Sequence, residues 1–183
     1  LSAYKNANKK RKNERAVYTV DKRMKRLYVS ALQSAIFNDV LAKRIETLDT
    51  VMPGDLAARN GGKSVFTVEE APEQLAIEQA RAAAFEINPT GPIAGYRSSI
   101  ATAAPGQIEV DALAARNIDI EDFRHVGRMK VKGARRALRF KISNLDVTTA
   151  SDDIGAHLLL KFTAPSGCYA TVLLEEMTKN KDA

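Results

Sequence analysis

The sequence has few residues that could bind a metal or form a disulfide. A single cysteine, Cys168, excludes an intramolecular disulfide, and with only His125 and His157 beside it the chain offers no metal-ligand cluster. No apolar run approaches the roughly 20 residues of a membrane-spanning helix. The first residues are polar and basic with no apolar stretch behind them, unlike a secretory signal. We therefore expect a cytoplasmic protein that binds neither a metal nor a membrane.

Tryptophan is absent and aromatic residues make up only 6% of the chain, so the core must consist mainly of Leu, Ile, Val and Ala. Hydrophobic residues make up 45%, which is enough for a globular core. A length of 183 residues fits one ordinary domain, or one domain and a piece of another. The sequence begins with Leu rather than Met, which we take as a first sign of a fragment.

Positive charge is concentrated at the start of the chain. The net charge is +6, yet residues 1–26 contain ten basic and two acidic side chains, so the remainder is slightly negative. The densest run is Lys9, Lys10, Arg11 and Lys12. A basic segment on a nearly neutral body favours a polyanionic partner, with nucleic acid the leading candidate. A solvated helix or linker would explain the charge alone equally well.

Hydrophobic periodicity and turn residues predict a mixed α/β or α+β chain. Apolar residues three or four positions apart predict a long helix over 27–45, and Pro72 and Pro105 each suit the first turn of a further helix. The glycines of Asn60-Gly61-Gly62 suit a hairpin turn. The expected helices cover 27–45, 72–86, 105–116, 120–124 and 169–179, and the expected strands cover 56–59, 64–68, 135–142 and 154–162, the last of them buried.

The segment 88–95 contains two prolines and two glycines. Proline lacks the N–H that a ladder needs, so we expect a shaped loop here rather than a helix or a central strand. Such a loop could touch a ligand, although a structural turn is the simpler interpretation. The segment lacks the Gly-Lys-Ser/Thr ending of a phosphate-binding P-loop.

A second basic cluster runs from 128 to 141 and contains no acidic residue. Arginine forks match phosphate geometry, and adjacent cations would repel one another without a counter-charge, so we predict that this cluster binds phosphates. The alternative is a solvated strand face. The members of the cluster are Arg128, Lys130, Lys132, Arg135, Arg136, Arg139 and Lys141.

Near the end of the chain, Ser166-Gly167-Cys168-Tyr169 lies between a predicted strand and a predicted helix. Tyr169 could stack on a nucleobase, or it could fill the core. Cys168 has only a weak case as a nucleophile, because no imidazole partner is evident.

Five ordered segments, which together span about residues 27–176, resemble motifs of the TruD-type tRNA pseudouridine synthases. Cys168 stands where that family usually has Ser, and Glu175 where Arg is common. The segments are the helix 27–38, Gly54-Asp55 with Phe66-Thr67-Val68, the loop Thr90-Gly91-Pro92-Ile93-Ala94-Gly95, Gly133-Ala134-Arg135-Arg136 with Leu138, and 159–162 with Pro165-Ser166-Gly167-Cys168-Tyr169-Ala170-Thr171-Val172.

The resemblance implies that uridine in tRNA is isomerised to pseudouridine without a cofactor. It divides the chain into a basic linker or helix (1–26), the TRUD insertion domain (27–141), and the last strand and helix of the catalytic domain (142–183). It also implies that Tyr169 lies at the wall of the target-base pocket. The basic residues would contact tRNA phosphates.

The reaction needs a carboxylate beside a flipped base, and the family's aspartate lies in a "GxKDxxA"-like segment that this sequence does not contain. We therefore assign no catalytic residue in this chain and expect the chain alone to be inactive. Three accounts stay open: a fragment of a full synthase, one chain of a split enzyme with a companion chain, or a non-catalytic RNA-binding relative in a ribonucleoprotein.

Overall fold

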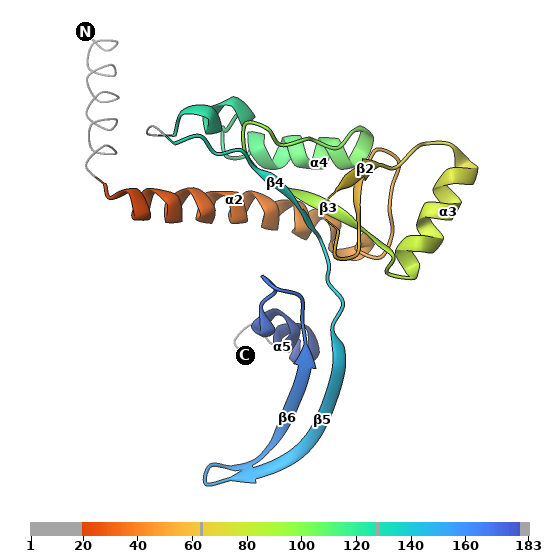
Figure 1. The fold of residues 1–183 in the computed structure, drawn as a ribbon, viewed down its shortest axis with the longest axis vertical. Helices are drawn as coiled ribbons and strands as arrows, with labels where there is room; N and C mark the ends of the chain where they lie inside the picture. Colours follow the sequence, from red (N-terminus) through yellow and green to blue (C-terminus); the bar gives the residue numbers. More distant parts are fainter. Residues whose placement is uncertain (1–19, 63, 127–128, 180–183) are drawn as a thin grey trace. The chain divides into compact units, whose positions relative to one another are not determined.

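A computed structural model describes residues 20–62, 64–126 and 129–179 (Figure 1). The basic run Lys9, Lys10, Arg11 and Lys12, and Arg128 of the second cluster, lie outside the described residues. The chain divides into two compact units, Leu1–Leu138 and Arg139–Ala183. The elements are α+β in kind, as predicted from the sequence. No helix in the described part of the chain is both long and apolar enough to cross a bilayer.

The first unit is organised around the long helix α2 (Lys22–Arg44). The helix begins five residues before the predicted start, because the Asp21 side chain accepts hydrogen bonds from the backbone N–H groups of Arg23 and Met24 and so caps it. Its buried face carries Ile36, Phe37 and Val40. A short 3-10 turn, η1 (Ile45–Thr47), follows it.

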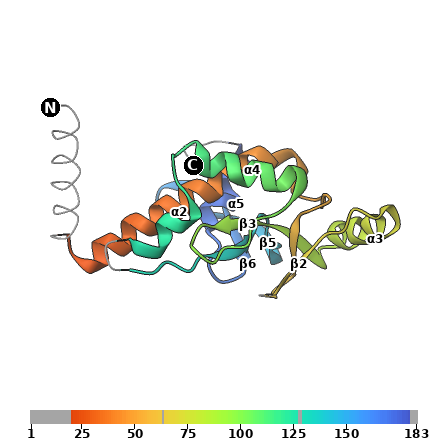
Figure 2. The ribbon, with the colours of Figure 1, turned by 90° about the horizontal axis from the view of Figure 1, so that it is seen from above.

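A four-stranded antiparallel sheet with strand order β2-β1-β3-β4 lies against α2 (Figures 1 and 2). The predicted hairpin is present: β1 (Leu56–Arg59) pairs with β2 (Val65–Thr67), and Ala57 lies opposite Phe66. β4 (Ala134–Ala137) forms the far edge. The sheet therefore brings residues 134–137 beside the segment around 90, more than forty residues earlier in the chain.

The expectation of a loop at 88–95 is wrong, because residues Ile87–Ile93 form the central strand β3. Its two neighbours pair with different halves of it: β1 reaches as far as Pro89, and β4 extends from Thr90 to Ile93. Leu138 donates its N–H to the Pro89 carbonyl at 2.9 Å. Alternate residues of a strand direct their backbone groups to opposite sides, so Pro89 faces β4 and Pro92 faces the other way. On that side the pairing with β1 has already ended, so the N–H that Pro92 lacks is not needed.

Three further helices complete the first unit: α3 (Pro72–Ala83), α4 (Ala103–Ala114) and η2 (Ile120–His125). They match the predicted helices to within three residues at each end. The larger core packs α2 against α4 and the sheet, and it includes Ile36, Phe37, Phe123 and Leu138. A smaller core around Val51, Val68 and Ile87 lies under α3.

The second unit consists of a two-stranded sheet and one helix. β5 (Ser143–Asp152) pairs antiparallel with β6 (Gly155–Thr163), and α5 (Ala170–Thr178) follows. The turn closes because the Asp152 carboxylate accepts hydrogen bonds from the N–H groups of Ile154 and Gly155. The sequence reasoning missed β5, and the strand expected over 135–142 ends at Ala137. β6 was expected to be buried, yet within the described chain most of its residues are exposed.

Candidate nucleic-acid interface

Arg135, a predicted phosphate contact, is a buried structural residue. Its side chain is only 6% exposed and forms a bidentate pair with the Glu109 carboxylate at 2.7 and 2.8 Å. Its remaining donors reach the Thr90 hydroxyl at 3.0 Å, the Thr90 carbonyl at 2.5 Å and the Ser99 carbonyl at 3.1 Å. A guanidinium has five N–H donors, and here all five have acceptors. The second basic cluster contains no acidic residue in sequence, and Glu109 of α4 supplies the counter-charge of Arg135.

A second buried pair has the same structural role. Arg44 donates to both carboxylate oxygens of Asp55, at 2.7 and 3.1 Å, and the two side chains are 3% and 0% exposed. Asp55 also accepts the N–H of Met52 at 2.8 Å. This pair joins the end of α2 to the start of β1. The Gly54-Asp55 motif thus has a structural role, and the negative charge of its carboxylate is balanced by Arg44.

The other described cations of the second cluster have more exposed positions. Lys130 and Lys132 lie exposed on the segment that leads into β4, and neither has an ion-pair partner among residues 20–62, 64–126 and 129–179. Arg136 is exposed on β4, with its guanidinium 5.5 Å from the centre of the Phe37 ring. Arg139 and Lys141 belong to the second unit.

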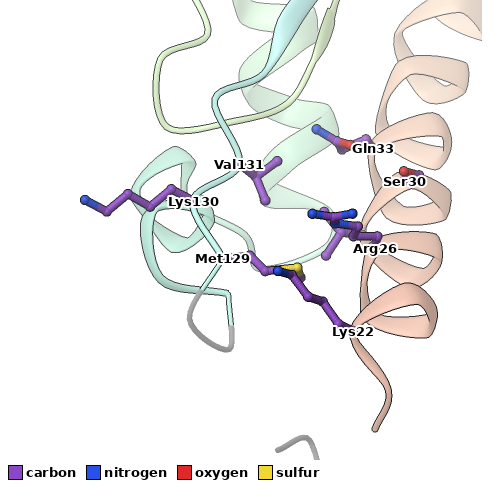
Figure 3. Close-up of a pocket in the computed structure, with 8 residues that line it drawn as sticks. Lys22, Arg26, Ser30, Gln33, Met129, Lys130 and Val131 are labelled. Atoms are coloured by element: carbon purple, nitrogen blue, oxygen red, sulfur yellow. The ribbon is translucent and has the colours of Figure 1, made fainter.

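A groove of about 450 Å³ opens between α2 and the segment 129–131 (Figure 3). We call it the α2 groove; it is lined by Lys22, Arg26, Val29, Ser30, Gln33, Met129, Lys130 and Val131. In Figure 3 the side chains of Arg26, Met129 and Val131 converge on it, whereas that of Lys130 extends to the opposite side of its segment. The groove combines exposed cations with an apolar wall.

The strand side of the α2 groove is held by the turn that follows β3. Tyr96 donates its N–H to the Val131 carbonyl, and Arg97 to the Lys132 carbonyl, each at 3.0 Å. The two backbones lie so close that a Cβ added at Gly95 would be 2.2 Å from the Gly133 nitrogen. These two motif glycines therefore fix the position of residues 130–132 beside α2.

Beside this turn, the half-buried Tyr96 ring is close to two arginines that were not predicted from the sequence. The Arg124 guanidinium is 4.5 Å and that of Arg97 is 5.5 Å from the ring centre. Arg124 also forms a bidentate hydrogen bond with Glu121, which holds the pKa of that carboxyl below its ordinary value and raises the pKa of Arg124. The arginines are spaced irregularly in sequence, so no local pattern signals the cluster.

In the second unit, Tyr169 is the N-terminal flanking residue of α5, and its side chain is 67% exposed within the described chain. Cys168 beside it is half-buried and has its thiol free. No group of three or more metal-binding side chains occurs among the residues that the structure describes. Tyr169 therefore presents an aromatic surface at the strand–helix junction where the sequence predicted a base contact.

The first unit is thus an α+β structure whose groove carries exposed cations, Lys22 and Arg26, that have no ion-pair partner among the described residues. The family model described as tRNA pseudouridine synthase D (TruD) matches residues 2–177, so the chain belongs to this family. The resemblance noted from the five sequence segments is thereby confirmed.

The chain is similar to several proteins named tRNA pseudouridine synthase D. It is 41% identical over 167 residues to the protein from Geobacter sp. (strain M21), covering 91% of this chain and 40% of that protein. It is 35% identical over 158 residues to the protein from Thermus thermophilus, covering 85% of this chain and 40% of the relative. The chain thus spans about two fifths of the length of the curated relatives that it matches.

The fold is similar to the crystal structure of a protein from Methanosarcina mazei assigned to tRNA pseudouridine synthase D. The TM-score is 0.68 and the sequence identity 27%, and the match covers 81% of this chain and 36% of the other. The relation is therefore supported by structure as well as by sequence.

Proposed function

We propose that this chain supplies tRNA-binding surface to a pseudouridine synthase that isomerises uridine to pseudouridine in tRNA. The observation that carries the proposal is the coincidence of the family match with unpaired, exposed cations beside the α2 groove. Exposed lysines and arginines attract the phosphate backbone without reading its sequence. The contacts proposed from this observation are the exposed Lys130 and Lys132, and Arg136 and Arg139 stay proposed only from their place in the second basic cluster. Arg135 is withdrawn, because its donors are already used. With tRNA as its substrate, the protein would work in the cytoplasm.

The catalytic carboxylate comes from outside this sequence in our proposal. The sequence lacks the family's aspartate segment. Among the described residues, the buried carboxylates are already engaged: Asp55 with Arg44, Glu109 with Arg135, and Glu78 with Arg81 and Gln74. A carboxylate that must act on a flipped base has to be accessible to that base. Because the sequence lacks the aspartate segment, we propose that this chain alone binds RNA without modifying it.

The second unit fits the role of an incomplete part of a larger domain. A two-stranded hairpin has little independent stability, and this one leaves large apolar side chains exposed. They are Leu145, Val147, Ile154, Leu158 and Leu159, with Val172 and Met177 on α5. We propose that the remainder of the synthase, in the same or a companion chain, covers these faces. Residues 142–183 would then complete the catalytic domain, with Tyr169 at the base pocket, and residues 27–141 would form the insertion domain.

Two measurements test the proposal. The chain should bind an unmodified tRNA transcript with an affinity that falls steeply as salt rises, and binding that is insensitive to salt would contradict it. The chain mixed with the N-terminal part of a relative that carries the aspartate segment should form pseudouridine in that transcript. Salt-dependent binding with no activity in the mixture would instead favour the alternative, a non-catalytic RNA-binding relative.

In the active mixture, Tyr169→Ala should lower turnover while leaving the salt dependence of binding unchanged. An unchanged turnover would remove Tyr169 from the base pocket.

A further inference from the structure

We propose that the α2 groove is a nucleotide-binding subsite for a single-stranded stretch of RNA. The inference rests on the proposed function and specifies how one part of the RNA is held. In it, Lys22 and Arg26 bind the phosphate, and the ribose and base pack against Val29, Met129 and Val131.

The first observation is the charge at the start of α2. Four of its first five residues, Lys22, Arg23, Lys25 and Arg26, are basic, and its first turn contains no acidic residue. The helix dipole is positive at this end, so cations here oppose helix formation. Helix stability therefore does not explain them. Lys22 and Arg26, one turn apart, both line the groove, and neither has an ion-pair partner within the described part of the chain.

The second observation is the chemical mixture within the groove. Val29, Met129 and Val131 are half-buried and supply apolar surface to the groove. Met129 and Val131 come from the strand side, whereas Val29 and the polar Ser30 and Gln33 come from α2. A surface that binds only a phosphate backbone needs no such wall. Apolar contact together with a few polar groups is what a nucleobase and its ribose require. A groove of about 450 Å³ lies within the size range of small-ligand sites, which is about 300–1,000 Å³.

The third observation is that one polar group in the groove has a fixed orientation. Gln33 donates from Nε2 to the Ala94 carbonyl at 2.6 Å. Because a carbonyl can only accept, this bond sets which end of the amide is which, and it leaves Oε1 as an acceptor. No protein donor to Oε1 is found among the described residues. An acceptor held in this way can bind an amino or imino N–H on a base edge.

Double-stranded RNA fits these features less well. A duplex presents phosphates and ribose hydroxyls while its bases stay stacked, and so it could not use the apolar wall. Single-stranded loops expose bases that such a wall can contact. We therefore assign the groove to an unpaired nucleotide.

The test compares charge-removing and groove-filling variants of the full 183-residue chain. Lys22→Gln and Arg26→Gln are made singly and together, and Lys43→Gln is the control for each single variant, because Lys43 is an exposed cation at the far end of the same helix. Ser30→Leu fills the groove without altering charge. Ala42→Leu, also exposed on α2 and outside the groove, controls for the added apolar side chain.

The probes are an unmodified tRNA transcript, a short single-stranded oligoribonucleotide and an RNA duplex of equal length. For the single strand, the double charge variant should reduce the slope of log affinity against log salt by about 0.7, corresponding to the one phosphate that the two cations bind. Ser30→Leu should weaken the single strand about tenfold, the loss expected for one packed base, with an unchanged slope. Duplex binding should change much less with Ser30→Leu.

The outcomes separate this subsite from the proposed function. If the wild-type chain does not bind the tRNA transcript, the proposed function fails. If it binds but the groove variants match their controls, only the subsite is overturned. The nucleotide assignment would also be overturned if Ser30→Leu lost affinity equally for the single strand and the duplex. The same would follow if polyglutamate displaced the oligoribonucleotide as well as RNA does at the same concentration of negative charge.

Discussion

The pair Glu109–Arg135 offers a direct test of whether an arginine in a basic cluster serves the fold or the ligand. Glu109→Gln keeps the shape of the side chain and removes its charge, leaving the Arg135 guanidinium buried without a counter-ion. The two side chains are 2% and 6% exposed, so water can do little to compensate. Removing one partner of a buried ion pair costs about 3–5 kcal/mol.

The expected loss is large compared with the total stability of a domain, which is about 5–15 kcal/mol. For a chain of this size it corresponds to a fall in the melting temperature of about 6–20 °C. Arg135→Gln should cause a similar loss, since Glu109 is then the uncompensated charge. Replacing both residues by Met should recover part of the stability, because an apolar pair needs no counter-charge. Urea denaturation followed by circular dichroism measures all three changes.

The functional half of the test is tRNA binding under conditions in which each variant stays folded. If Arg135 is structural, Glu109→Gln and Arg135→Gln should leave the salt slope of binding unchanged, whereas Lys132→Gln should reduce it by about 1. The reasoning would be refuted if Arg135→Gln flattened the slope while Glu109→Gln left it intact. That result would mean that the guanidinium leaves its five acceptors to bind a phosphate.

Three further results are expected. Asp55→Ala should destabilise the first unit by about 3–5 kcal/mol in urea denaturation, because Arg44 is left buried and unpaired, and a wild-type midpoint would contradict this. Gly95→Ala should cost about 1–3 kcal/mol, since its Cβ would displace neighbouring backbone; a neutral effect would show that the turn can shift. In NMR titration, Glu121 should have a lower pKa than in Arg124→Gln, so its stabilising contribution is present at neutral pH and disappears as pH falls through the folded pKa; equal values would show that the bond does not persist in solution.

The helices of the first unit could be predicted from sequence because each carries its own signals. α2 has an apolar stripe that ends in the core residues Ile36, Phe37 and Val40. α3 begins at Pro72, which suits the first turn of a helix. Such signals are local, so they can be recognised in the sequence without knowing which elements the helix packs against.

The central strand could not be predicted, because the prolines of β3 are tolerated only through the register of two neighbours. Pro89 and Pro92 lie where one ladder or the other does not require their N–H. The long hairpin of the second unit was difficult for another reason. Its first strand, β5, is exposed along almost its whole length within this chain, so it has no buried face of its own to mark it as a strand.

The candidate site shows that basic residues clustered in a sequence do not necessarily lie together on a binding surface. Arg135 and Arg136 are adjacent, yet one is buried against Glu109 from α4 and the other lies exposed on β4. Adjacent residues of a strand point to opposite faces, and the face of Arg135 meets a carboxylate that lies 26 residues away in the sequence. Conversely, Arg26 and Val131 are far apart in the sequence, and packing brings them to one groove.

We therefore expect RNA to contact cations that are not engaged in structural ion pairs. Arg44 and Arg135 join helices to the sheet, and replacing either should be detected first as lost stability. Lys22 and Arg26 join nothing in the described chain and oppose the dipole of their own helix. Replacing them should leave stability unchanged or slightly higher while RNA affinity falls. Opposite signs of the two effects cannot arise from a structural role, and they would identify these residues as part of the interface.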